Sequence, residues 1–324
     1  MTEYPVQTLV RVVCHECILL CEVNTLSRIE KLVDEYLNTF SSRVTVRQAC
    51  KLGLSRRALE YLSARDPQWG NGSKIAEHAA TKGLLHVITW VGECYPDRTA
   101  WRTGENVPLM DIAAEYNHLS ILQWLHANRT EGCTTDAIDR AAAVGNLEIV
   151  RWLHLFREEG CTKQAMNDAA AYGHLAVIEY LHENRSEGCD KSAVNNAAAN
   201  GHLAVVRFLL ENRREGSTGD AMCQAAANGH LEMAQWLYVN RGDGHAGAAL
   251  RCAAEKGHAA VVEWLYWIVC DERRGASIIH DAAELALKAG HKKVAKQLER
   301  KLKRQREPKT SKPKKRTQRR HRRY

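Results

Sequence analysis

One short unit recurs at a constant interval through most of this chain, and that recurrence restricts the possible folds more than any other feature of the sequence. Its clearest marker is a column of evenly spaced glycines, with an asparagine in the same place one unit earlier, and the numbering gives a period of 28. Looser copies surround Gly83 and Gly290, and an atypical first copy surrounds Gly53. The markers predict about nine units. The column consists of Asn117, Gly145, Gly173, Gly201, Gly229 and Gly257.

Each unit has the pattern of two short helices. An alanine pair precedes the glycine, and a second apolar pair lies four residues earlier, as in Ala165-Met166 and Ala169-Ala170, which is the spacing of one helical face. After the glycine, apolar residues again follow at helical spacing. A single helix pair cannot bury both apolar faces, but stacked pairs form one continuous core. The sequence therefore predicts an all-α solenoid of about nine helix-turn-helix repeats.

An aromatic residue stands at the seventh position after each marker of the column, directly before a leucine. We predict that this aromatic column is buried and contacts neighbouring units. On that basis Trp152→Ala should cost about 3–5 kcal/mol, the usual range for a buried aromatic. The aromatic column consists of Trp124, Trp152, Tyr180, Phe208, Trp236 and Trp264.

The paired alanines, the Gly-His pairs such as Gly173-His174 and the apolar second helix resemble the ankyrin repeat over roughly residues 45–300. That resemblance implies an ankyrin-like helical solenoid that serves as a non-catalytic scaffold or adaptor for a protein partner. The family period is about 33 residues, so the shorter unit of this chain has lost most of the β-hairpin finger. The family's Thr-Pro-Leu-His start is replaced, for example by Asp136-Ala137-Ile138-Asp139.

The repeats indicate where a partner binds. Residues that hold the fold are constant between units, whereas the residue before each alanine pair and the residues just before each glycine change freely. Side chains that vary within an otherwise constant repeat are typical of a partner-specific surface. The alternative interpretation is neutral sequence drift on a solvated face. The candidate partner-binding residues are His78, Tyr116, Arg140, Asp168, Tyr172, Asn196, Asn200, Gln224 and Asn228.

Three regions are expected. Residues 1–44 form an N-terminal helical cap, for which a partner-binding helix is the alternative interpretation. Residues 45–300 form the repeat array, and residues 301–324 form a disordered basic tail with almost no apolar side chains. The formal charge of +8 is uneven, because residues 292–324 carry +15 and residues 1–291 carry −7.

The tail resembles a nuclear import signal around Pro313-Lys314-Lys315-Arg316. Such basic runs bind import receptors or phosphates, so the alternative function is sequence-independent binding of nucleic acid through the tail. The tail lacks interleaved aromatics before Tyr324, which counts against nucleic acid, and a solvated extension without a partner is a third possibility. The residues of this nuclear-localisation-like segment are Lys312, Lys314, Lys315, Arg316, Arg319, Arg320, Arg322 and Arg323.

Recurring polar columns are assigned structural roles. The histidines that follow the glycines, such as His174 and His202, are expected to form hydrogen bonds at the turn between helices. Cys133, Cys161 and Cys189 are expected to be small packing residues, since stacked helices lie about 8–10 Å apart. A third column pairs arginines at the ends of the second helices with acids two residues later, which we expect to neutralise one another between units.

No arrangement predicts catalysis, a cofactor or a metal. Residues 242–247 match Gly-x-Gly-x-x-Gly, but they follow a helix rather than a strand. Cys14, His15, Cys17 and Cys21 lack a second pair of zinc ligands at zinc-finger spacing.

The first residues, interrupted by charges, predict no secretion, and no apolar run approaches the length of a membrane span. Eleven cysteines without an export signal indicate reduced thiols, and we expect a nuclear or cytoplasmic protein.

Overall fold

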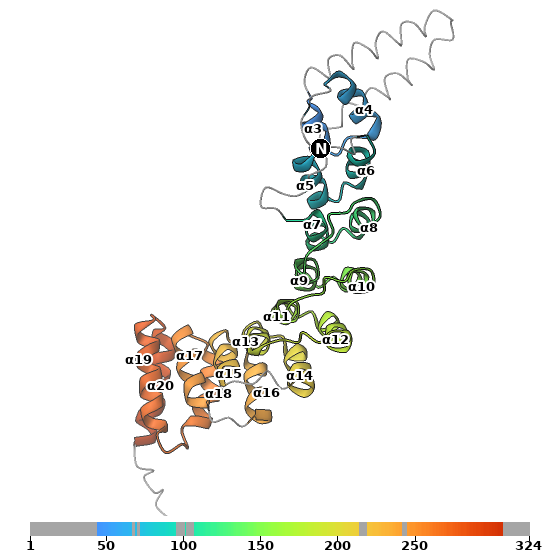
Figure 1. Cartoon of the computed structure of the whole chain (residues 1–324). Helices are drawn as coiled ribbons and strands as arrows, with labels where there is room; N and C mark the ends of the chain where they lie inside the picture. Colours follow the sequence, from blue (N-terminus) through green and yellow to red (C-terminus); the bar gives the residue numbers. More distant parts are fainter. Residues whose placement is uncertain are drawn as a thin grey trace, which may run out of the picture. The chain divides into compact units, whose positions relative to one another are not determined.

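The computed structural model describes residues 44–66, 69, 72–94, 101, 107–213, 219–241 and 245–306. These described residues form 18 α-helices and no β-strand, which confirms the all-α prediction (Figure 1). Odd-numbered helices are the first helices of the repeats and even-numbered helices the second. The chain divides into two compact units, Met1–Ala137 and Ile138–Tyr324. The predicted N-terminal cap, apart from Val44, and the nuclear-localisation-like residues lie outside the described residues.

In the first unit, the first helices pack in sequence, α3 on α5 and α5 on α7, and the second helices likewise, α4 on α6 and α6 on α8. The helices of this unit are α3 (Val46–Lys51), α4 (Arg56–Arg65), α5 (Ser73–Lys82), α6 (Leu85–Cys94), α7 (Leu109–Glu115) and α8 (Leu119–Asn128). Helix α9 (Asp136–Ala143) spans the division between the units.

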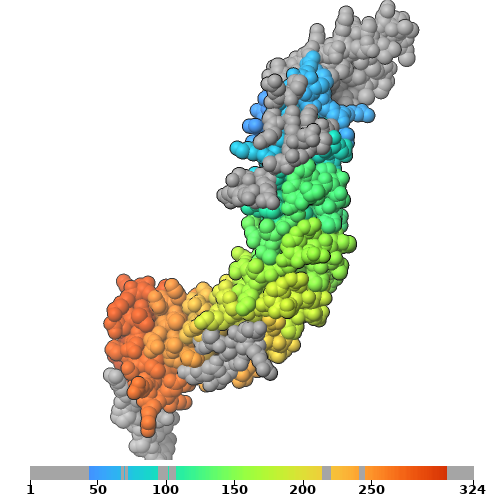
Figure 2. Space-filling model, viewed as in Figure 1, coloured from blue at the N-terminus to red at the C-terminus, as the bar shows by residue number. Residues whose placement is uncertain are grey.

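In the second unit, α11, α13, α15, α17 and α19 form a row of first helices, each packed on the next. Helices α10 with α12, α12 with α14, α16 with α18 and α18 with α20 belong to the second row. Within the unit the colours of Figure 2 succeed one another in sequence order, as expected when repeats contact their neighbours. The remaining helices are α10 (Leu147–Phe156), α11 (Lys163–Tyr172), α12 (Leu175–Asn184), α13 (Lys191–Ala199), α14 (Leu203–Asn212), α15 (Gly219–Ala227), α16 (Leu231–Arg241), α17 (Ala246–Lys256), α18 (Ala259–Val269), α19 (Gly275–Lys288) and α20 (Lys292–Arg306).

The alanine pairs form the contact between first helices. Ala169, Ala170, Ala197 and Ala198 are all 0% exposed, because methyl side chains let neighbouring helices approach closely. The apolar pairs of the second helices are equally buried. The connections between repeats that the structure describes, such as residues 157–162, carry no strand, in agreement with the predicted loss of the hairpin finger.

The aromatic column contacts neighbouring repeats as predicted, but the prediction of full burial was wrong. Trp152, Tyr180 and Trp236 are half-buried, whereas the leucines that follow them are buried. The rings of His154 and of Tyr180 in the next repeat form a T-shaped pair, with ring centroids 5.8 Å apart. The aromatic side chains of this column lie along the boundary between core and solvent, because no third layer among the described residues packs over the row of second helices.

Helix α20 continues through Arg306, beyond the predicted start of the disordered tail at Lys301. Leu302 explains the difference, since its side chain is only 7% exposed and continues the apolar face of Ala295 and Leu298. Among the described helices, none is both long enough and apolar enough to cross a membrane.

Candidate partner-binding surface

The candidate partner-binding residues of the second unit lie along the exposed side of the first helices. Positions one and five residues before each glycine fall on one helical face, so each helix contributes up to two of them. We call this set the first-helix ridge. It consists of Arg140, Asp168, Tyr172, Asn196, Asn200, Gln224 and Asn228.

All ridge residues are at least partly exposed. Tyr172 is 64% exposed although it is aromatic, whereas Asn196, Asn200, Gln224 and Asn228 are exposed amides. Asp168 is half-buried and accepts a hydrogen bond from Gln164 Nε2 at 2.7 Å on the same helix.

Asn200 and Asn228 also support the fold. Asn200 Nδ2 donates to the carbonyl of Ala171 in the preceding repeat at 2.7 Å, and Asn228 Nδ2 donates to the carbonyl of Gln224 at 3.1 Å. Their side chains are therefore partly engaged by neighbouring backbone.

The first unit holds the other two candidates. His78 lies on α5 and its Nε2 donates to the carbonyl of Lys51 at 3.3 Å, so this histidine joins two repeats. Tyr116 ends α7 and is 47% exposed. Both therefore occupy the positions expected from the repeat.

Residues of the histidine column fix the ridge by joining repeats to the ones before them. His174 Nε2 donates to the carbonyl of Ala143 at 3.1 Å, and His118 donates likewise to Thr81 at 3.2 Å. The imidazole also lies directly over the preceding glycine, since a Cβ on Gly145 would stand 2.4 Å from His174 Nδ1. The predicted hydrogen bond at the turn is confirmed for His174, and it runs between repeats.

A second connection between first helices was missed by the sequence analysis. The buried Asp139 carboxylate accepts hydrogen bonds from the Thr162 backbone N–H at 2.9 Å and from its hydroxyl at 2.6 Å. Asp111 binds Thr134 in the same way. The signal was present in the sequence, because Asp111, Asp139 and Asn167 are separated by one repeat period and each has its partner 23 residues later.

Three arginines of this column, Arg129, Arg157 and Arg185, are neutralised within their own repeats, and for these the prediction of neutralisation between units was wrong. Arg157 pairs with Glu159, and Arg185 with Glu187. Two residues apart, both lie in the extended turn after the second helix, where their side chains reach one another. Burial raises the pKa of Glu187, but the hydrogen bond from Arg185, backbone hydrogen bonds and the arginine charge together outweigh burial and place the glutamate pKa below its usual value.

The described cysteines form no disulfide with one another, and Cys161 and Cys189 are buried as predicted for packing residues, whereas Cys133 is half-buried. Burial, followed by the charge of Glu187, raises the pKa of Cys161 to about 11. Cys252 differs, because the hydrogen bond from Cys223 on the neighbouring first helix lowers its pKa to about 7. Cys252 stands on α17 at the ridge position five residues before Gly257, which makes it a potential nucleophile on that face.

Two further observations concern sites off the ridge. An open hollow of about 570 Å³ at the end of α10 is lined by Phe156, Arg157, Glu158 and Glu159. Phe156, 55% exposed, replaces the asparagine that ends α12 in the equivalent place. The described residues contain no cluster of three or more histidine, cysteine, aspartate or glutamate side chains arranged to hold a metal ion.

Comparison with known families agrees with this geometry. A family profile described as ankyrin repeats (3 copies) matches residues 138–220 and 166–248, and one described as ankyrin repeats (many copies) matches residues 110–154. A comparison with curated proteins found no match. The matched segments coincide with repeats whose alanine pairs are described above. The chain is therefore an ankyrin repeat protein with a short repeat unit.

Proposed function

We propose that this protein is a non-catalytic scaffold or adaptor that holds a protein partner on the first-helix ridge. Ankyrin repeats generally mediate protein–protein interaction and are typically non-enzymatic. The observation that carries the proposal is the ridge itself. Its side chains vary between repeats while the junctions beneath them remain constant.

The chemistry of the ridge indicates what it binds. On α11, α13 and α15, Asp168 is the one charged ridge residue, and the others are amides and Tyr172. An amide side chain offers both a donor and an acceptor, so a row of them matches the main-chain groups of an extended segment. The exposed phenol of Tyr172 supplies apolar contact area beside a polar tip. We infer a partner segment that is polar and presents its backbone to the ridge.

The test compares two triple variants of the full chain in quantitative affinity capture. The first, Asp168→Ala/Asn196→Ala/Gln224→Ala, removes ridge side chains that do not bridge repeats in the described structure. The matched control, Glu179→Ala/Glu183→Ala/Glu211→Ala, removes exposed polar side chains from the second helices α12 and α14.

Proteins lost from the ridge variant and retained by the control are ridge partners, and titration with the purified partner should show at least about a tenfold weaker Kd. Equal binding by both variants would show that the ridge is only a solvated face.

For localisation, we propose that the segment from Lys312 to Arg323 directs nuclear import. A fluorescent fusion that lacks residues 312–323 should lose nuclear enrichment, and the segment alone should confer it on an inert carrier. An unchanged distribution in both assays would favour the cytoplasm.

A further inference from the structure

Helix α20 presents a continuous basic face to solvent. Val294, Ala295, Leu298 and Leu302 are buried, and α20 packs on α18 and α19. Exposed cations cover the other side, within about a third of the helix circumference. This basic face consists of Lys292, Lys293, Lys296, Arg300, Lys303 and Arg304.

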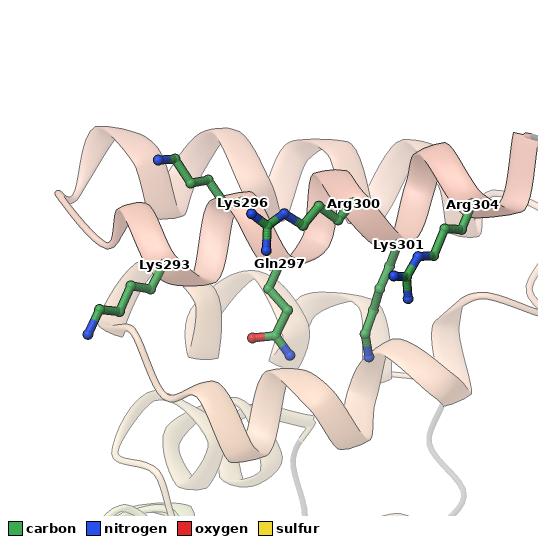
Figure 3. A pocket seen from close by; sticks show the side chains of 6 residues that line it. All are labelled: Lys293, Lys296, Gln297, Arg300, Lys301 and Arg304. Atoms are coloured by element: carbon green, nitrogen blue, oxygen red, sulfur yellow. The ribbon is translucent and has the colours of Figure 1, made fainter.

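An open groove of about 510 Å³ runs along this face, and Figure 3 shows the side chains that line it. Two of its lining residues, Gln297 and Lys301, point to α18, where both bind the carboxylate of Glu263. The four other lining residues, Lys293, Lys296, Arg300 and Arg304, form no ion pair with any residue that the structure describes. Their charges are therefore available to an anion from solution.

An exposed aromatic ring lies beside Lys301, which lines the same groove. Trp267 on α18 is 63% exposed, and Lys301 Nζ lies 5.0 Å from its ring centroid. The indole Nε1 donates to the same Glu263 carboxylate at 3.3 Å, which holds the ring in place. The corresponding position of other repeats holds residues such as Ala127, Glu183 and Glu211. The fold thus places an aromatic group next to the basic segment, and this is the kind of group that the tail sequence lacks.

We propose that the basic face of α20, together with Trp267, binds single-stranded nucleic acid without sequence preference. The lysines and arginines contact phosphates, and an unpaired base stacks on the indole. The cations from Lys293 to Arg304 extend over about 16 Å of helix, enough to follow a strand through several phosphates. This activity is separate from protein binding on the first-helix ridge, because it uses α18 and α20.

The observations favour this polyanion over others. A membrane-binding amphipathic helix inserts its apolar face, whereas that face of α20 is buried within the protein. In a duplex the bases are stacked inside, so Trp267 would have no base to contact. An acidic peptide gains nothing specific from an exposed indole.

The phosphate contacts are tested with the full chain and a fluorescein-labelled thymidylate strand of about 20 nucleotides, long enough to exceed one binding site, by anisotropy at several salt concentrations. Lys296→Gln/Arg300→Gln/Arg304→Gln should raise Kd at least about tenfold near 0.1 M salt. It should also reduce the slope of log K against log salt by about 2, since each lost phosphate contact removes about 0.7.

The matched control Lys82→Gln/Lys191→Gln/Lys256→Gln changes the net charge equally through exposed lysines on α5, α13 and α17. It should leave that slope unchanged. An α20 variant that binds with the parent slope and affinity would overturn the proposal.

The stacking contact is tested at Trp267. Trp267→Leu, which keeps apolar volume but has no ring face, should weaken binding about tenfold with an unchanged salt slope, and Trp267→Phe should recover most of the loss. Thermal unfolding of each variant shows whether it is folded. If a folded Leu variant binds as tightly as the parent, Trp267 has no part in the site.

Two further arms separate the possible ligands. Duplex DNA of the same length and vesicles containing phosphatidylserine should bind more weakly and without dependence on Trp267. Tighter binding to either would overturn the choice of single strands. Deleting residues 307–324 should weaken binding, yet the effects of the α20 and Trp267 substitutions should persist. If they vanish in the shortened chain, the tail alone is the ligand site.

Discussion

At the scale of single residues, the junctions between repeats depend on a glycine whose missing side chain makes room for a histidine. Gly173 adopts φ +83°, and a Cβ there would lie 2.5 Å from His202 Nδ1. Gly290 has a similar φ of +89°, but no described atom would lie within 4 Å of its Cβ. Substitution of Gly290 therefore tests backbone strain alone, whereas substitution of Gly173 tests strain together with contact with the next repeat.

We expect Gly173→Ala to destabilise the protein more than Gly290→Ala. Both substitutions force alanine into a left-handed conformation that costs about 1–2 kcal/mol, but only the first displaces a histidine. Urea unfolding should show an extra loss of about 1–3 kcal/mol for Gly173→Ala, as for other overpacked sites. Adding His202→Ala should relieve part of that extra loss. Equal effects at the two glycines would contradict the junction described here.

Cys252 should be the most reactive thiol among the described cysteines. The hydrogen bond from Cys223 places the pKa of Cys252 below the usual thiol value, whereas burial raises the pKa of Cys161 to about 11. Alkylation by iodoacetamide, followed site by site with mass spectrometry, should therefore rise with pH around a lower midpoint at Cys252 than at Cys161. Cys223→Ala removes the hydrogen bond and should move that midpoint upward. A Cys252 midpoint unaffected by this substitution would exclude the proposed cause.

At the scale of one helix, α10 shows how sharply the buried side is defined. Leu153 is 0% exposed and Leu155 is 71% exposed, although both are leucines two positions apart on the same helix. The half-buried Trp152 lies between these extremes. The helical period alone decides which of these side chains reaches the core.

Leu153→Ala should therefore cost about 2–5 kcal/mol, the usual range for a buried leucine, whereas Leu155→Ala should change stability by less than about 0.5 kcal/mol. Trp152→Ala should cost less than the roughly 3–5 kcal/mol expected of a buried aromatic, because part of its ring already contacts water. Chemical denaturation of the three variants measures this ranking. A loss at Leu155 as large as at Leu153 would mean that the helix faces are assigned wrongly.

The helices were predictable because the constant period repeats the same apolar pattern many times. Exposure of the ridge also followed from the period, since Tyr172 and Asn196 lie opposite the buried alanines. The degree of burial of the aromatic column could not be predicted from the period. The sequence pattern shows on which face of the helix Trp152 lies, but not how much protein covers that face. The Asp139–Thr162 connection was missed because the carboxylate and its partner lie in different repeats, and no pattern within one helix joins them.

At the scale of the whole molecule, the end of the last repeat is set by one apolar side chain. Leu302 is buried, so α20 contributes to the folded array beyond residue 300, in the part of the chain predicted to be disordered. The neighbouring Lys301 reaches Glu263, 38 residues earlier. The sequence pattern could not predict the Lys301–Glu263 contact or the place of the nearby Trp267, because these residues do not follow the repeat period.

Two truncations should therefore behave differently. A chain ending at residue 306 should unfold at nearly the temperature of the full chain, since the removed segment is highly charged and poor in apolar residues. A chain ending at residue 300 should unfold several degrees lower, because it loses Leu302 and the Lys301–Glu263 ion pair. Calorimetry of both chains provides the measurement. Equal transitions would place the end of the folded array before Lys301.

The Gly-His junctions have a consequence for how such a chain evolves. Because most junctions join the same two columns, as in Gly173 with His202 and Gly201 with His230, the edge of one such repeat fits the edge of another. Recombination that adds or removes the codons of one whole repeat between equivalent positions leaves each remaining junction with its partners. The number of repeats can therefore change independently of the junctions. The array then lengthens or shortens by whole repeats.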